Sequence, residues 1–262
     1  RRARRLRRPA IGLILGLVMV GGSYWFSDKL AIKSARAVPV SREQLPQYYE
    51  IMEDLTARAN MPMPRLYITP SQQPNAFATG RNPNNAAVAV TEGLLQAMNW
   101  EQVRGVLAHE LAHIRNRDIL IGSVAAAIGM GITFAARMVM WGALLGGNNR
   151  DRNPIGELAF ALLAPIAAML IQAAVSRSRE FQADESAARL LGTGEPLAQA
   201  LQQLESYANR IPAAVDPNQA SNYIIDPLKA QARGGQGGGF GKLFSTHPST
   251  DDRIARLRSL NL

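Results

Sequence analysis

The 262-residue chain contains no cysteine, only three histidines and modest shares of charged (19%) and aromatic (6%) residues. Without cysteine it can form no disulfide and no thiolate metal site, and it has no cysteine nucleophile. Any metal site must therefore be built from His, Asp or Glu. The 47% share of hydrophobic residues excludes disorder as the dominant state, and a chain of this length can bury a sizeable core.

The net charge of +9 is concentrated at one end of the chain. A terminal cluster without interleaved aromatic residues is not typical of a nucleic-acid interface, so we expect no nucleic-acid partner. A basic run directly before an apolar segment is typical of contact with lipid headgroups, and the lipid bilayer is the expected partner. Six of the nine charges come from the first eight residues: Arg1, Arg2, Arg4, Arg5, Arg7 and Arg8.

Three long apolar runs follow. Residues 9–27 carry no charge, are about long enough to cross a bilayer and end near Tyr24 and Trp25, which suit a membrane interface. A signal peptide has a similar start, but no small-residue cleavage pattern follows, which favours a retained transmembrane helix. Residues 119–149 contain one charge and residues 158–176 none, and the short polar link between these runs predicts a transmembrane hairpin. The alternative is a buried helical hairpin in a soluble protein.

A hairpin returns the chain to the side of the membrane that it left, so the polar segments on either side of it can form one domain. Residues 212–236 are expected to be irregular, and the glycine-rich residues 232–241 are expected to form a flexible loop without the features of a nucleotide site. Apolar periodicity and Pro/Gly punctuation predict short extended pieces at 65–69 and 86–91, and helices at 42–60, from Glu92, and at 179–191, 196–209 and 251–260.

The most informative motif is H-E-x-x-H, formed by His109, Glu110 and His113. Four residues make just over one helical turn, so both imidazoles project from one face and can share a metal. Glu110 lies beside them and can take a proton from a water molecule that the metal activates. The alternative, two surface histidines on a helix, is disfavoured because the chain has only three histidines and the motif has apolar neighbours.

A catalytic zinc site uses three protein ligands and leaves one position open. His247 is the remaining histidine, but Glu180 is the better third ligand. Glu180 and Asp184 lie four residues apart, so Glu180 can bind zinc while Asp184 orients a histidine ligand through its other N–H. This spacing alone is more often a solvated helix face. The hairpin strengthens the assignment because it returns Glu180 to the membrane face from which His113 departs.

With these motifs in place, the chain resembles the HtpX-type membrane-embedded zinc endopeptidases, which are related to the CAAX prenyl proteases. The resemblance covers nearly everything from Tyr24 onward, and several independent strings occur in the right order. They are YWFSDKLA at 24–31, PNAFATGRNP at 74–83, VAVTEGLL at 88–95, VLAHELAHIRNRDIL at 106–120, SRSREFQADESAARL at 176–190 and FSTHPSTDDRIARL at 244–257.

The resemblance implies one zinc ion on His109, His113 and Glu180, with Glu110 as general base. We expect a mainly α membrane protein with a zincin-like (gluzincin) α+β catalytic domain that contains a small sheet and is interrupted by a transmembrane hairpin. The expected parts are a basic N-terminus and transmembrane helix (1–27), the first half of the protease domain (28–118), the hairpin (119–176) and the second half (177–262).

Two further groups of residues gain meaning through the resemblance. His247 and Arg253, in the pattern H-P-x-x-x-x-R, match positions near the active site, where a cation could stabilise the tetrahedral oxyanion. The alternative is a structural turn followed by a surface helix. The segment 75–79 resembles the one that lines the substrate cleft in this family, where an extended edge could pair with the substrate backbone. The alternative is a loop with a buried Phe77. The residues of this segment are Asn75, Ala76, Phe77, Ala78 and Thr79.

The resemblance also implies a multi-pass protein of the bacterial inner membrane that clears misfolded or damaged membrane proteins, with an active site facing the cytoplasm. The positive-inside rule alone would place the arginine run in the cytoplasm and the active site outside. Family members carry a further upstream span, which would restore a cytoplasmic site. The alternative functions are a membrane scaffold or partner-binding protein with a structural or vestigial zinc site, and a soluble metalloprotease.

Overall fold

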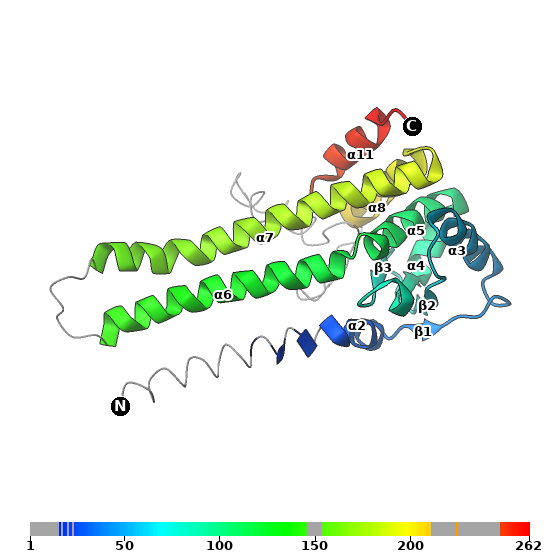
Figure 1. Ribbon diagram of the computed structural model, residues 1–262. Coiled ribbons are helices and arrows are strands. Elements are labelled where there is room, and N and C mark those ends of the chain that lie inside the picture. The colour runs from blue at the N-terminus through cyan, green and yellow to red at the C-terminus, as the bar shows by residue number, and fades with distance from the viewer. Residues whose placement is uncertain are drawn as a thin grey trace.

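In the computed structural model, a pair of long helices extends from a domain that contains a small sheet (Figure 1). The structure describes residues 24–145, 154–210 and 247–262, together with Ile224 and five positions between 16 and 22. The expected first transmembrane helix at 9–27 therefore lies partly outside the described residues, the irregular stretch at 212–236 almost wholly, and the glycine-rich loop at 232–241 wholly.

The sheet has four strands in the order β1-β2-β4-β3. Strand β4 is central: it pairs in parallel with β2 and antiparallel with β3, and all five of its residues are buried. Strand β3 forms one edge, so it has a free side in the described part of the chain. The extended pieces expected at 65–69 and 86–91 are confirmed as β2 and β4. The strands are β1 Val38–Pro39, β2 Arg65–Thr69, β3 Ala76–Thr79 and β4 Ala87–Thr91.

Most of the described chain is helical. The helices expected at 42–60, 196–209 and 251–260 are confirmed as α3, α8 and α11 within a few residues. The separate helix expected at 179–191 is instead the last part of α7, because no glycine or proline interrupts the chain after the preceding span. The helices are α2 Ser27–Ser34, α3 Pro46–Ala59, α4 Glu92–Ala97, α5 Trp100–Arg115, α6 Asp118–Leu145, α7 Pro154–Leu191, α8 Glu195–Arg210 and α11 Thr250–Ser259, with a 3-10 turn at Pro83–Asn85.

Helix α5 lies at the centre of the domain, where it packs against α7, α8 and β3. Its fully buried Leu107 shares a hydrophobic core with Leu197 of α8 and Tyr48 of α3. The close approach of α8 needs Gly105, since a Cβ there would lie 2.5 Å from the backbone nitrogen of Leu197. Segments before and after the helical pair thus contribute to one core.

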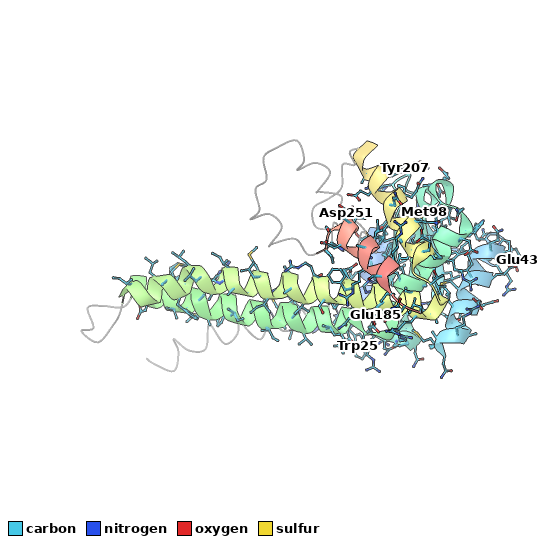
Figure 2. All side chains as sticks on the ribbon, turned by 90° about the horizontal axis from the view of Figure 1, so that it is seen from above. Trp25, Glu43, Met98, Glu185, Tyr207 and Asp251 are labelled. Carbon is cyan, nitrogen blue, oxygen red and sulfur yellow. The ribbon has the colours of Figure 1, made fainter. Side chains whose placement is uncertain are left out.

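Helices α6 and α7 lie side by side and leave the domain together (Figure 1). Figure 2 shows their side chains projecting around the pair along its length. Both are long and apolar enough to cross a membrane, and only 11% and 17% of their most apolar windows are buried. A core hairpin of a soluble protein would be mostly buried. The exposed apolar side chains include Val124, Ile128, Met138, Trp141, Leu158, Leu162, Leu163 and Ile166.

The end of the hairpin that adjoins the domain is marked by aromatic residues. Trp25 lies there in Figure 2, and the guanidinium of Arg81 stacks over its ring at 4.5 Å from the centroid. The hydroxyl of Tyr24 donates to the carbonyl of Arg81 at 2.6 Å. Amphipathic rings at this level suit the headgroup region, with lipid on the hairpin side and water on the domain side.

Candidate metal centre

Helix α5 holds the H-E-x-x-H motif in its last two turns. The helix begins with a capping box between Asn99 and Gln102, which satisfies two backbone N–H groups and sets the helical phase. His109 and Glu110 are buried, whereas the side chain of His113 keeps 18% of its exposure. The Nε2 atoms of the two imidazoles lie 3.0 Å apart, so the motif brings both to one point as its spacing predicts.

Helix α7 brings a carboxylate to the same point. Glu180 Oε2 lies 3.6 Å from His109 Nε2, and Glu180 Oε1 lies 3.6 Å from His113 Nε2. One ligand atom from each of the three residues lies within 4.8 Å of the others. Ligand atoms of a tetrahedral zinc site, with bonds of about 2.0–2.2 Å, are roughly 3.3–3.6 Å apart. The observed separations of 3.0–3.6 Å therefore fit a single metal ion held by two imidazoles and a carboxylate.

His109 is supported from behind by a buried pair of charges. Its Nδ1 lies 3.0 Å from Asp184 Oδ1, and Arg253 donates to both oxygens of Asp184, at 2.8 Å from Nε and 2.7 Å from Nη2. This bidentate pairing holds the carboxylate in place. Burial alone would lower the pKa of His109, but Asp184 and Glu180 raise it to about 10. A metal that binds Nε2 would displace a proton that the metal-free imidazole holds near neutral pH.

Glu110 interacts both with the two imidazoles and with the edge strand β3. The backbone N–H of Ala78 in β3 donates a hydrogen bond to the Glu110 carboxylate. Burial raises the pKa of Glu110, and the neighbouring His113 and His109 oppose part of this shift. A raised pKa makes the carboxylate a stronger base, which suits proton transfer from water. Glu110 is thus linked by a hydrogen bond to the strand that carries Ala78.

The two predicted residues near the C-terminus also reach this cluster. His247 is buried, and its Nδ1 lies 3.7 Å from Glu180 Oε2. Arg253 lies in the first turn of α11, and its Nη1 is 3.4 Å from the same Glu180 oxygen. The alternative, in which Arg253 lies on the surface of a helix, is therefore wrong, since Arg253 is only 2% exposed. Most of its donors are engaged by Asp184 and by the carbonyl of Ile224, so its geometry suits positioning as much as contact with substrate.

The segment expected to line the substrate cleft is a strand with a polar residue before it. Asn75 is buried, precedes the edge strand β3, and accepts from the backbone N–H of Ile224 at 3.2 Å. The alternative of an irregular loop is not observed, since Ala76 to Thr79 pair in register with β4. Phe77 is partly exposed rather than buried, so the buried-Phe explanation of the string is also wrong.

Three residues near the site were not predicted: Asp118, Arg179 and Ile224. Asp118 Oδ2 lies 2.5 Å from His113 Nδ1, and Arg179 donates to the carbonyl of Asp118 at 2.7 Å. The main chain of Ile224 links Asn75 to Arg253. The sequence does place Asp118 only five residues after His113. Residues five apart do not face each other on a helix, so the spacing does not predict this contact.

Comparison with known proteins places the chain among relatives of similar length. The model of Peptidase family M48 matches residues 43–261. A protease HtpX homolog from Pelotomaculum thermopropionicum is 51% identical over 243 residues, which are 91% of this chain and 84% of that protein. A protease HtpX homolog from Aquifex aeolicus is 44% identical over 261 residues, which are 95% of this chain and 84% of that protein. The crystal structure of S. mikatae Ste24p shares the fold, with a TM-score of 0.58 at 21% identity, covering 93% of this chain and 56% of that chain.

The metal-ligand cluster and the two membrane-capable helices fit a membrane-bound metallopeptidase, and the family match assigns the chain to that class. The resemblance to the HtpX-type proteases is confirmed by identities of 44–51% over most of the chain. The chain belongs to Peptidase family M48. It is therefore an enzyme with a metal cofactor and peptide substrates, which decides against the scaffold and the soluble alternatives.

Proposed function

We propose that this chain is a zinc endopeptidase that hydrolyses misfolded or damaged membrane proteins, with zinc on His109, His113 and Glu180. The observation that carries the proposal is the meeting of three ligand atoms from α5 and α7 beside the buried Glu110. Zinc is supported by the donor set, since two imidazoles and one carboxylate are ligands of catalytic zinc in hydrolytic enzymes and leave one position open.

The protein's own residues divide the remaining work. Zinc, when bound, supplies Lewis acidity that makes a water molecule acidic near neutral pH and polarises a carbonyl group. Glu110 accepts the proton of the attacking water and later passes it to the leaving amine. Asp184, held by Arg253, orients the His109 ring. His247 and the charge of Arg253 stabilise the oxyanion that develops on the scissile carbonyl.

The substrate is bound as an added strand on β3. The residues proposed to bind it are Asn75 and the four residues of β3, which form a sheet edge next to Glu110. Main-chain hydrogen bonds to such an edge do not depend on side-chain identity, so they suit an enzyme that must accept many sequences. An unfolded segment can supply an extended backbone, whereas a folded one cannot.

The membrane position of the site suits membrane proteins as substrates. His113 lies five residues before the start of α6, and Glu180 follows the apolar part of α7 by four residues, so the site lies near the expected membrane surface. We propose that the protein resides in the bacterial inner membrane with this domain in the cytoplasm. Protease accessibility tests the sidedness. A cytoplasmic domain is expected to be cleaved by added protease in inverted vesicles and protected in right-side-out vesicles.

The mechanism is tested by comparing the wild-type chain with Glu110→Gln in detergent, using an unfolded model protein and added Zn²⁺. The wild type is expected to cleave, and Glu110→Gln is expected to keep its zinc while its rate falls by about 10²–10⁴-fold. Glu101→Gln makes the same chemical change at an exposed position of α5 and is expected to behave as wild type. Cleavage by zinc-loaded Glu110→Gln at the wild-type rate would refute the role of Glu110.

A further inference from the structure

Asp118 makes a contact that the catalytic proposal does not use. Helix α5 ends at Arg115, and Arg117 adopts a left-handed conformation with φ of 56°, which turns the chain sharply into α6. The turn carries the Asp118 carboxylate back to His113, where Oδ2 lies 2.5 Å from Nδ1. Asp118 is 6% exposed, so this contact is shielded from water.

The contact with Nδ1 sets both the orientation of the His113 ring and the nitrogen that carries its proton. A carboxylate on Nδ1 keeps the proton on that nitrogen and leaves Nε2 as the atom with a free lone pair. His113 Nε2 faces His109 Nε2 at 3.0 Å and Glu180 Oε1 at 3.6 Å. Asp118 therefore stands to His113 as Asp184 stands to His109, but it comes from the start of α6 and not from the last part of α7.

The main chain of Asp118 makes a second link, to the other membrane helix. Arg179 Nη1 donates to the Asp118 carbonyl at 2.7 Å, and Arg179 directly precedes Glu180 in α7. The guanidinium lies against Gly122, one turn further along α6, where an added Cβ would be 2.5 Å from Arg179 Nη1. One residue thus contacts the ring of one metal ligand and the neighbour of another.

We propose that Asp118 is a positioning residue that couples the metal ligands to the packing of the two membrane helices. Its carboxylate orients His113, and its carbonyl, through Arg179, sets the distance from α6 to the part of α7 that carries Glu180. A change in how α6 and α7 pack would then alter the geometry of the ligands. This inference rests on metal binding by His113 and Glu180 as proposed above.

The first test measures metal binding by the full chain in detergent. Zn²⁺ affinity is determined by competition with a chelator, and the ligand field is followed through the visible absorption of Co²⁺. Asp118→Ala is expected to weaken Zn²⁺ binding by about 10–100-fold and to shift the Co²⁺ bands, as loss of such a hydrogen-bond partner does. Asp118→Asn keeps an oxygen that accepts from Nδ1–H, so it is expected to recover part of the affinity.

A matched control is Asp54→Ala, which removes a carboxylate that pairs with Arg58 and with Arg104 of α5, away from the ligands. It is expected to bind Zn²⁺ as the wild type does. Wild-type affinity and an unchanged Co²⁺ spectrum in Asp118→Ala would overturn the positioning role. Failure of the wild type itself to bind Zn²⁺ would instead overturn the proposed function, so the two failures are distinguishable.

The second test probes the coupling without changing any group that contacts a ligand. Gly122→Ala places a methyl group 2.5 Å from Arg179 Nη1, so the flexible guanidinium is expected to shift and to weaken its hydrogen bond to the Asp118 carbonyl. Gly131→Ala in the same helix meets nothing within 4 Å and is the matched control. We expect shifted Co²⁺ bands in Gly122→Ala only, with unchanged thermal unfolding of the metal-free protein. Identical spectra of the two variants would refute the coupling.

Discussion

Helix α7 has two regions with different surroundings: a membrane region at 158–176 and a domain region at 177–191. In the membrane region, large apolar side chains face outward, and Leu162 and Leu163 are 59% and 62% exposed. In the domain region, two carboxylates face inward, and Glu180 and Asp184 are 8% and 2% exposed. The helix is continuous through both regions, so the difference comes from the surroundings and not from secondary structure. An exposed leucine is stable in contact with lipid, whereas a buried carboxylate is stable only when hydrogen-bond donors or opposite charges pair with it.

The partners in the domain region show how that acceptance is achieved. The buried carboxylate of Asp184 receives two donors from Arg253 and lies 3.0 Å from His109. Removing one partner of such a buried pair leaves an uncompensated charge, which is strongly destabilising. The membrane region contains no equivalent cluster among its described residues. Substitutions should therefore affect metal binding in one region and membrane insertion in the other.

The largest expected effect comes from removing the proposed metal ligand Glu180 from the domain region. In Glu180→Ala, the metal content is expected to fall from about one ion per chain to background, because two imidazoles alone hold zinc weakly. Elemental analysis after removal of free metal measures this. Glu185→Ala, which removes the half-buried acid labelled on α7 in Figure 2, is expected to keep its metal. If Glu180→Ala retained one zinc ion per chain, a different third ligand would be required.

A charge on the outward face of the membrane region should have a smaller effect. Leu163→Arg is expected to cost about 2.5–3.5 kcal/mol of insertion free energy near the helix centre. The measurement is the fraction of protein that stays in membranes after alkaline extraction. Leu262→Arg, at an exposed leucine of the domain, is expected to leave that fraction unchanged. Equal membrane retention of the two variants would contradict the assignment of α7 to the bilayer.

The smallest expected effect concerns an exposed ion pair that joins α8 to α11. The hydrogen bond from Arg258 lowers the pKa of Glu195 below its usual value. A lowered folded-state pKa contributes stability above the unfolded pKa, and this stability is lost as pH falls through the folded pKa. Glu195→Gln is expected to cost about 0.2–1 kcal/mol at pH 7, since exposed pairs contribute little.

Thermal unfolding of the metal-free chain at pH 7 and at about pH 3 measures the effect of Glu195→Gln, because an ordinary Glu titrates near 4.3. The difference from wild type is expected to shrink as the pH falls, because protonation of the wild-type carboxylate removes the charge that pairs with Arg258. Glu205→Gln, another acid of α8, serves as the control for a change of net charge. A difference that persists at low pH would mean that Glu195 acts through packing and not through its charge.

Contacts between residues close in sequence are predicted more accurately than contacts between residues far apart in sequence. The helix with His109 and His113 is predicted by local spacing, and β2 and β4 by apolar composition. Glu180 is predicted only by combining a motif with membrane topology. Asp118 is missed because its contact depends on the left-handed residue Arg117, an arginine in a conformation that arginine seldom adopts. The sequence predicts Arg253 as a cation near the active site, but it does not predict the ion pair of Arg253 with Asp184.

Sequence alone determined which chemistry is available to this protein. With no cysteine and three histidines, only His109 and His113 have the spacing of two imidazole ligands on one helix face, and the apolar runs mark the membrane helices. Tertiary structure alone decided which carboxylate supports which imidazole: Asp184 on His109 from α7, and Asp118 on His113 from the start of α6. The physical reason is that helical periodicity specifies neighbours within one turn, whereas contacts between helices depend on turns and packing that no local pattern encodes.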